Sequence, residues 1–165
     1  MIAVAPGVDV LIEMRARLAD LYAAYDDALG EGDYERWPEF FTEACVYKII
    51  PRENYDAGLP LALMQAESRG MLVDRVTSLR RVLMYEAHRY RHLVGPTRIM
   101  SLDGEVAETR SNVIVARIMH SGETSLFATG RYLDRIAVAG EPYRFVERLV
   151  VLDSQKIDTL IAIPL

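Results

Sequence analysis

Cysteine is almost absent from this chain of 165 residues, since Cys45 is the only one. A single cysteine excludes an internal disulfide and suits a protein from a reducing compartment. Cys45 stands in an apolar run between Ala44 and Val46, so we expect a buried thiol rather than a nucleophile. No cysteine cluster is available to bind a metal.

Long apolar runs are also missing. A membrane-spanning helix needs about 18 or more uninterrupted apolar residues, and no window of this sequence approaches that length. Pro6, Gly7 and Asp9 interrupt the N-terminal stretch, and no basic region precedes it, so no signal peptide is expected. We therefore expect a cytoplasmic protein that makes no contact with a membrane.

Lysine is scarce, because 17 of the 19 basic residues are arginine and only Lys48 and Lys156 are lysine. The net charge of −5 argues against nucleic-acid binding, which normally requires a basic face. Arginine makes planar, bidentate contacts and is enriched at protein interfaces. The arginine bias therefore hints at protein partners.

The chain is predicted to form one domain over residues 1–165, with residues 1–8 as a loose tail. Its 51% hydrophobic content is sufficient for a core, and no linker, repeat or low-complexity tract divides it.

Four long strands are predicted between Arg91 and Asp153. Three turn signals separate them, each centred on a glycine that accepts the positive φ of a tight turn: Gly104, Gly122 and Gly140. Strands of roughly ten to fifteen residues must twist and curl, which creates a concave face that needs filling.

The N-terminal half supplies the filling. Apolar residues at steps of three and four predict a helix from Asp9, its N-cap, to Gly30, and another that starts at Met71 and continues through Leu83. We expect the second helix to cover the concave face. Between the two helices, Asp33 can cap a short helix that carries an aromatic cluster, Ala44–Ile50 reads as a strand, and Leu61–Met64 could be another. The aromatic cluster, expected to close one end of the sheet, comprises Tyr34, Trp37, Phe40 and Phe41.

The predicted fold class is therefore α+β: N-terminal helices packed in a strongly curved, mostly antiparallel sheet of about six strands. The apolar stretch from Ile157 to Leu165 is expected to dock on its own domain or on a neighbour, since a free apolar tail would be adhesive.

The stretch Tyr85–His92 is the most polar and aromatic part of the chain. We interpret it as an extended entry into the strands, which places His88 and His92 on one face and Arg89 and Arg91 on the other.

Three uses of these histidines stay open. They could bind a metal with Glu86 or Asp74, but no His-Glu-x-x-His motif supports this. A histidine could also form a general-base dyad with an acid inside the sheet. Structural or interface use is favoured over both.

The last strand carries a carboxylate, Glu147, on the same predicted face as Phe145. We expect it to pair with Arg131 or Arg135 on the adjacent strand. Arg144 and Arg148 are predicted to point to the opposite face, toward another subunit or toward solvent.

Several sequence runs resemble one family, the small (beta) subunits of aromatic-ring-hydroxylating dioxygenases, and most closely those of the terephthalate enzymes. The likeness extends in order from about Tyr22 to the C-terminus. The runs are Arg36–Cys45, Met71–Val76, Tyr85–His92, Arg117–Glu123, Ala128–Asp134 and Asp158–Leu165.

The resemblance implies a cone of the nuclear-transport-factor-2 type and a non-catalytic role. In this family three small subunits form a homotrimeric base beneath three large (alpha) subunits in an α3β3 assembly. The large subunits carry the Rieske [2Fe-2S] cluster and a mononuclear iron. A Rieske cluster needs two cysteines and two histidines, which one cysteine cannot supply.

The predicted function is therefore a structural subunit in the oxidation of an aromatic carboxylic acid, with no cofactor in this chain. One alternative is a stand-alone dehydratase or isomerase of the same cone fold that uses a histidine–acid dyad. Another is a binding module for a small aromatic ligand. No catalytic or metal residue is carried over from the family, only a subunit-interface role for residues in the matching runs: Asp74, Arg75, His88, Arg89, Arg91 and His92.

Overall fold

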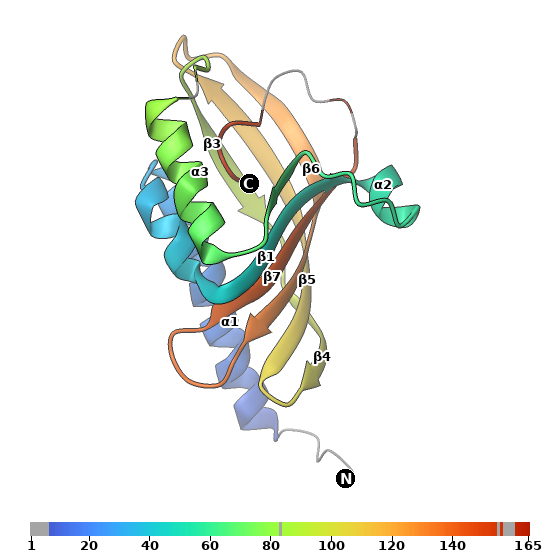
Figure 1. Cartoon of the computed structure of the whole chain (residues 1–165). Helices are drawn as coiled ribbons and strands as arrows, with labels where there is room; N and C mark the ends of the chain where they lie inside the picture. Colours follow the sequence, from blue (N-terminus) through green and yellow to red (C-terminus); the bar gives the residue numbers. More distant parts are fainter. Residues whose placement is uncertain (1–6, 83, 155, 157–160) are drawn as a thin grey trace.

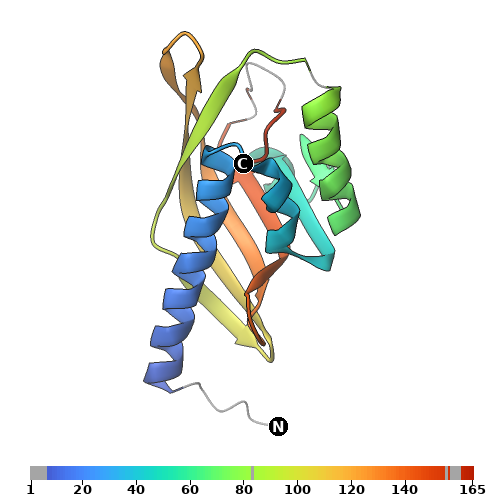
Figure 2. The same ribbon diagram turned by 90° about the vertical axis from the view of Figure 1, so that its left-hand side faces the viewer.

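The computed structural model describes residues 7–82, 84–154, 156 and 161–165. A strongly curved sheet of seven strands, which does not close into a barrel, wraps around the helices (Figures 1 and 2). The sequence predicted this arrangement with about six strands.

Helix α1 spans Val8–Gly30 and ends at Gly30, as predicted. Its start differs from the prediction, because Gly7 rather than Asp9 is the N-cap residue and makes no side-chain cap hydrogen bond. Asp9 lies in the first turn instead, where its charge favours the helix dipole. Val8 is therefore helical and not part of a loose tail, and residues 1–6 lie outside the described residues.

The predicted short helix is a 3-10 helix, η1, over Tyr34–Phe40, and the following strand β1 runs through Phe41–Pro51. The strand thus starts three residues before the predicted Ala44. Trp37 and Phe41 are fully buried, and Trp37 meets Tyr47 edge-on with ring centroids 5.0 Å apart. This confirms that the aromatic cluster belongs to the core.

The polar loop after β1 contains a short helix, α2, over Arg52–Asp56, which the sequence did not predict. The next strand, β2, covers Met64–Ala66 and pairs antiparallel with β1. Only Met64, the first residue of β2, belongs to the proposed strand Leu61–Met64.

Helix α3 spans Arg69–Arg81, two residues earlier than the predicted start at Met71. Ser68 is its N-cap and accepts a hydrogen bond from the Met71 backbone N–H at 3.3 Å. The predicted end at Leu83 lies outside the described residues. Helix α3 packs on η1 and β1, not on the concave face of the long strands, so that prediction was wrong.

Five further strands follow. The first predicted strand is in fact two, separated at Gly95-Pro96, and both pair antiparallel with the same long strand. Proline cannot donate to the ladder, which explains the break. The strands are β3 (His88–Val94), β4 (Arg98–Asp103), β5 (Val106–Met119), β6 (Thr124–Ala137) and β7 (Arg144–Leu152).

The three glycine turns are confirmed. Gly104, Gly122 and Gly140 have φ of 59°, 91° and 83°, in the region that favours glycine. They connect β4 to β5, β5 to β6, and β6 to β7.

The strand order is β2-β1-β7-β6-β5-β3. Strand β4 lies off this path and also pairs with β5. All pairs are antiparallel except β1 with β7. This parallel pair joins β1, the first strand, to β7, the last strand, and so attaches the N-terminal half of the chain to the sheet.

Helix α1 lies along the concave face of the sheet (Figure 2). Its Tyr22 ring meets Phe145 of β7 edge-on at 5.8 Å, and Tyr25 meets the same ring at 5.5 Å. Helix α1 therefore fills the role that the sequence assigned to the later helix.

A bulge in β7 changes which side chains face the core. Ile136 pairs with Phe145 and Arg135 with Glu147, so Val146 is the extra residue. Because of this extra residue, Phe145 and Arg148 both point inward, although they are three residues apart. The prediction that Phe145 shares a face with Glu147, with Arg148 on the other side, was wrong.

Candidate functional site

The interior of the cone contains an ion pair between Arg148 of β7 and Asp134 of β6. Both side chains are fully buried, and two hydrogen bonds of 3.0 and 2.9 Å join them. Burial alone would lower the pKa of Arg148, but Asp134, Tyr25 and Tyr22 together outweigh this effect and hold the pKa well above its ordinary value. Arg148 is thus a buried permanent cation, not the exposed or intersubunit arginine that the sequence predicted.

Aromatic rings surround this cation. The guanidinium carbon lies 3.9 Å from the ring centroid of Phe145, 4.1 Å from that of Tyr132 and 4.3 Å from that of Tyr25. The Tyr22 hydroxyl from α1 donates to Asp134 and lies 3.0 Å from the Thr109 hydroxyl. The network therefore ties α1 to β5, β6 and β7.

The end of the sequence fills another part of the interior. Residues 161–165 are all buried, which confirms for these residues that the apolar tail docks on its own domain. Residues 157–160 lie outside the described residues. The hydroxyls of Tyr25 and Tyr47 donate to the Leu165 carbonyl at 3.1 and 3.0 Å, and Arg75 donates to the Ile161 carbonyl at 2.8 Å.

The six predicted interface residues come from two elements, Asp74 and Arg75 from α3 and the other four from β3. Asp74 and Arg89 are both exposed. Arg91 is exposed and lies 3.7 Å from Glu31 of its own chain, while Arg75 is half-buried and used by the tail. Their interface role stays a prediction, best suited to the exposed members.

The two histidines share a strand face, as predicted, and His92 lies deeper than His88. The His88 Nδ1 is 2.7 Å from the Glu86 carbonyl oxygen. His92 is 8% exposed, and burial, assisted by Arg148 and Arg91, lowers its pKa to about 4. Asp74 lies on a different element, and no group of three or more metal-binding side chains gathers among the described residues.

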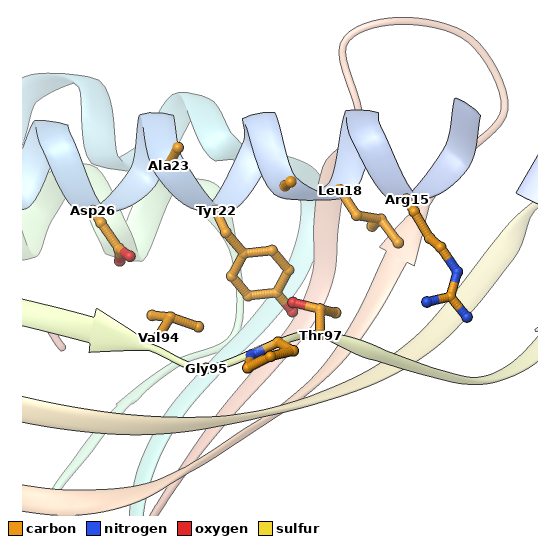
Figure 3. A pocket seen from close by; sticks show the side chains of 10 residues that line it. Arg15, Leu18, Tyr22, Ala23, Asp26, Val94, Gly95 and Thr97 are labelled. Atoms are coloured by element: carbon orange, nitrogen blue, oxygen red, sulfur yellow. The ribbon is translucent and has the colours of Figure 1, made fainter. Parts of the chain in front are cut away.

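A cleft of about 470 Å³ separates α1 from the segment that joins β3 to β4 (Figure 3). Asp26, Tyr22, Leu18 and Arg15 point from α1 toward residues 94–97. Burial raises the pKa of Asp26 to about 6, although the charge of Arg148 opposes the rise. The sequence did not single out Asp26 or Arg15.

A second cleft, of about 500 Å³, lies on the other flank of α1. Two of the arginines that line it bond within the chain: Arg17 forms ion pairs with Glu13 and Glu141, and Arg144 donates to the Glu39 backbone carbonyl at 3.2 Å. Arg144 thus also bonds within its own chain, which the sequence had not foreseen.

The central network could not be read from sequence patterns. Tyr132, Asp134 and Ile136 alternate as a strand should, but a bulge decides that Arg148 meets them. Glu147 lies directly opposite Arg135, so the predicted neighbour on the adjacent strand is correct. The Tyr22 contact joins residues more than eighty positions apart in the chain and has no local signal.

Comparison with known proteins gives a consistent result. Residues 26–159 match the family model described as the ring hydroxylating beta subunit. The beta 2 subunit of the terminal oxygenase component of terephthalate 1,2-dioxygenase from Comamonas sp. is 42% identical over 149 residues, which cover 90% of this chain and 97% of that protein. The anthranilate 1,2-dioxygenase small subunit from Burkholderia cepacia is 39% identical over 132 residues, covering 79% and 81% of the two chains.

A solved structure agrees with these sequences. The crystal structure of a beta subunit assigned to the aromatic-ring-hydroxylating dioxygenases, from Novosphingobium aromaticivorans, superposes with a TM-score of 0.87. It is 35% identical, and the match covers 94% of this chain and 99% of that one. Separately, none of the helices in the described part of the chain is long and apolar enough to cross a membrane.

Proposed function

The chain belongs to the family of ring-hydroxylating dioxygenase beta subunits and has its nuclear-transport-factor-2-like fold, and from this premise we propose that it is the non-catalytic small subunit of such an enzyme. The observation that carries the proposal is the match to the family model over residues 26–159, together with relatives about as long as this chain. In this role the chain stabilises catalytic large subunits.

The use of the interior supports a structural role. Among the described residues, Arg148 and Asp134 are the most deeply buried charges, and their hydrogen bonds hold the sheet and α1 together. The buried residues 161–165 occupy more of the interior with apolar side chains. These groups contribute to the stability of the cone.

The proposed assembly has three copies of this chain as a base beneath three large subunits, in the cytoplasm. The Rieske cluster and the mononuclear iron belong to the large subunit, since a Rieske cluster takes two cysteines and this chain has one. The terephthalate and anthranilate enzymes among the relatives favour an aromatic carboxylic acid as the substrate of the complex.

Co-expression with the cognate large subunit tests this proposal. A tag on this chain should recover the large subunit, and the complex should have the mass of three copies of each chain by light scattering. The visible absorption of the Rieske cluster should follow the large subunit only. Tightly bound iron at one per chain, in this chain purified alone, would refute the non-catalytic role.

The alternative of a dehydratase or isomerase is favoured by one observation, the buried position of His92 on the concave face. Substituting His92 by alanine separates the two functions. An enzyme should lose turnover and keep its assembly, whereas a structural subunit has no turnover to lose and should show only weaker folding or assembly.

A further inference from the structure

Helix α1 has a cleft on each flank, and the two differ in how their polar groups are satisfied. On one flank, Arg17 forms ion pairs with Glu13 and Glu141. On the other flank, the Oδ1 atom of Asp26 is buried and has no hydrogen-bond partner among the described residues. Arg15 forms no ion pair with the described part of the chain. A buried polar atom without a partner is costly, which makes the Asp26 flank the candidate for an external ligand.

Two more buried polar side chains have atoms without hydrogen-bond partners in the described chain. His92 precedes Val94, a wall residue of the cleft, by two positions on the same strand face, and both of its ring nitrogens lack hydrogen-bond partners in the described chain. The Tyr132 hydroxyl is fully buried and equally unsatisfied there. Burial raises the pKa of Tyr132, the charge of Arg148 opposes the rise, and the charge of Asp26 adds to it. The inner end of the cleft is polar because Asp26 lines it, whereas His92 and Tyr132 are not among its lining residues.

The outer end of the cleft carries a positive charge. Arg15 and Thr97 border the cleft there, and Figure 3 shows the Arg15 guanidinium extended from α1 on that side. A free guanidinium is a good partner for a carboxylate, because its fork of N–H donors matches the two oxygens.

The walls between the two ends are apolar. Leu18, Ala19 and Ala23 of α1 face Val94 and Pro96, and the Tyr22 ring forms the floor (Figure 3). Arg15 and Asp26 are eleven positions apart on one helix, a rise of about 16 Å at 1.5 Å per residue. That spacing is roughly the length of two linked six-membered rings with a polar group at each end, plus a hydrogen bond to each group.

We propose that this cleft, defined by Arg15, Asp26 and Thr97, is a binding site for an elongated, largely apolar monocarboxylic acid with a hydrogen-bond donor at its far end. The carboxylate meets Arg15, the rings lie between α1 and residues 94–97, and a hydroxyl or amino group donates to Asp26. The site goes beyond the role as a structural subunit. It belongs to this chain alone and does not depend on a large subunit.

Isothermal titration calorimetry on the full chain tests the site with 4′-hydroxybiphenyl-4-carboxylate. We expect one molecule bound per chain. Biphenyl-4-carboxylate lacks the donor, 4-phenylphenol lacks the carboxylate, and 4-hydroxybenzoate has one ring, so each should bind at least tenfold more weakly, as expected for the loss of one charge-assisted hydrogen bond or of one ring.

Matched variants assign the two ends. Asp26→Asn should weaken the hydroxylated probe about tenfold and leave biphenyl-4-carboxylate unchanged, whereas Arg15→Gln should weaken both biphenyl carboxylates and leave 4-phenylphenol unchanged. Arg17→Gln, on the opposite flank of the same helix, is the control and should bind the probe like the wild type. Ala19→Trp fills the cleft from an exposed helix position without removing a polar group, and it should abolish binding.

The proposal is overturned if the wild-type chain binds none of the four probes at millimolar concentration. It is equally overturned if a probe binds but Ala19→Trp, with an unchanged melting temperature, binds it as tightly as the wild type. Equal weakening by Arg15→Gln and Arg17→Gln would also contradict it, since only Arg15 borders the cleft.

Discussion

Replacing Arg148 by methionine tests whether the buried ion pair organises the cone. The guanidinium is fully buried, makes two hydrogen bonds to Asp134 and lies against several aromatic rings, with that of Phe145 at 3.9 Å. The variant leaves the Asp134 carboxylate buried with only the hydroxyl of Tyr22 and no positive partner. Removing one partner of a buried pair typically destabilises a protein by about 3–5 kcal/mol.

The loss can be measured by urea unfolding of the full chain. Trp37 is the single tryptophan and is fully buried, so its fluorescence reports the unfolding of the core. We expect the urea midpoint to fall with an unchanged slope m. For a chain of this size about 1 kcal/mol corresponds to roughly 2–4 °C, so the melting temperature should fall by roughly 6–20 °C.

Two further variants complete the experiment. Arg52→Met removes an arginine that pairs with Asp56 at the surface, 3.4 Å away, and should change stability by less than about 1 kcal/mol. The double variant Arg148→Met with Asp134→Leu removes both charges and should be more stable than Arg148→Met alone. A loss of under about 1 kcal/mol for Arg148→Met, equal to that of Arg52→Met, would refute the reasoning.

Four other predictions concern pH, hydrogen bonding and packing. The pKa of His92 is about 4 in the folded chain and 6.5 in the unfolded chain, so its contribution to stability is complete above pH 6.5 and is lost as the pH falls through 4. Between pH 7 and pH 5 this loss is about 2 kcal/mol of unfolding free energy. His92→Gln should remove it, which urea unfolding at the two pH values can measure. Asp26 should have the opposite effect on the pH dependence of stability, because its pKa is raised to about 6 in the folded chain. Its contribution is complete below pH 3.8 and is lost as the pH rises through 6. Asp26→Asn should therefore stabilise the chain at pH 7, and no gain in stability there would contradict the burial of Asp26. Tyr47→Phe removes both hydrogen bonds to Leu165 and should cost about 1–3 kcal/mol by thermal unfolding, whereas Tyr55→Phe on the exposed α2 should cost almost nothing. A methyl group at Gly130 would clash with the backbone carbonyl of Val151 on the neighbouring strand, so Gly130→Ala should lower the melting temperature markedly and Gly7→Ala, with open space around it, should not.

Local patterns predicted most of the elements. The three- and four-residue periodicity located α1 and α3, and glycines located the turns at residues 104, 122 and 140, because helix period and positive φ are properties of a few neighbouring residues. The alternation from residue 88 to 92 correctly placed the two histidines on one strand face. The sequence runs that resemble the beta subunits also predicted the family correctly.

The candidate site was harder to foresee. Arg15 and Asp26 read as ordinary polar positions on an amphipathic helix, and only the path of residues 94–97 beside α1 turns them into the two ends of a cleft. Which helix covers the sheet was also predicted wrongly, because α1 and α3 both have an apolar stripe of suitable length. Periodicity predicts which face of a helix is buried, but it does not predict which other element covers that face.

The sequence by itself determined a single α+β chain with N-terminal helices, long, glycine-separated strands and too few cysteines for a Rieske cluster, since composition, periodicity and turn chemistry are local. Only the tertiary structure decided that Arg148 enters the core, that Asp134 and Tyr22 meet it there, and that the Oδ1 atom of Asp26 has no hydrogen-bond partner among the described residues. The physical reason is the extra residue Val146: one inserted residue reverses the facing of the strand beyond it, and contacts between distant strands and helices then determine which charges are paired.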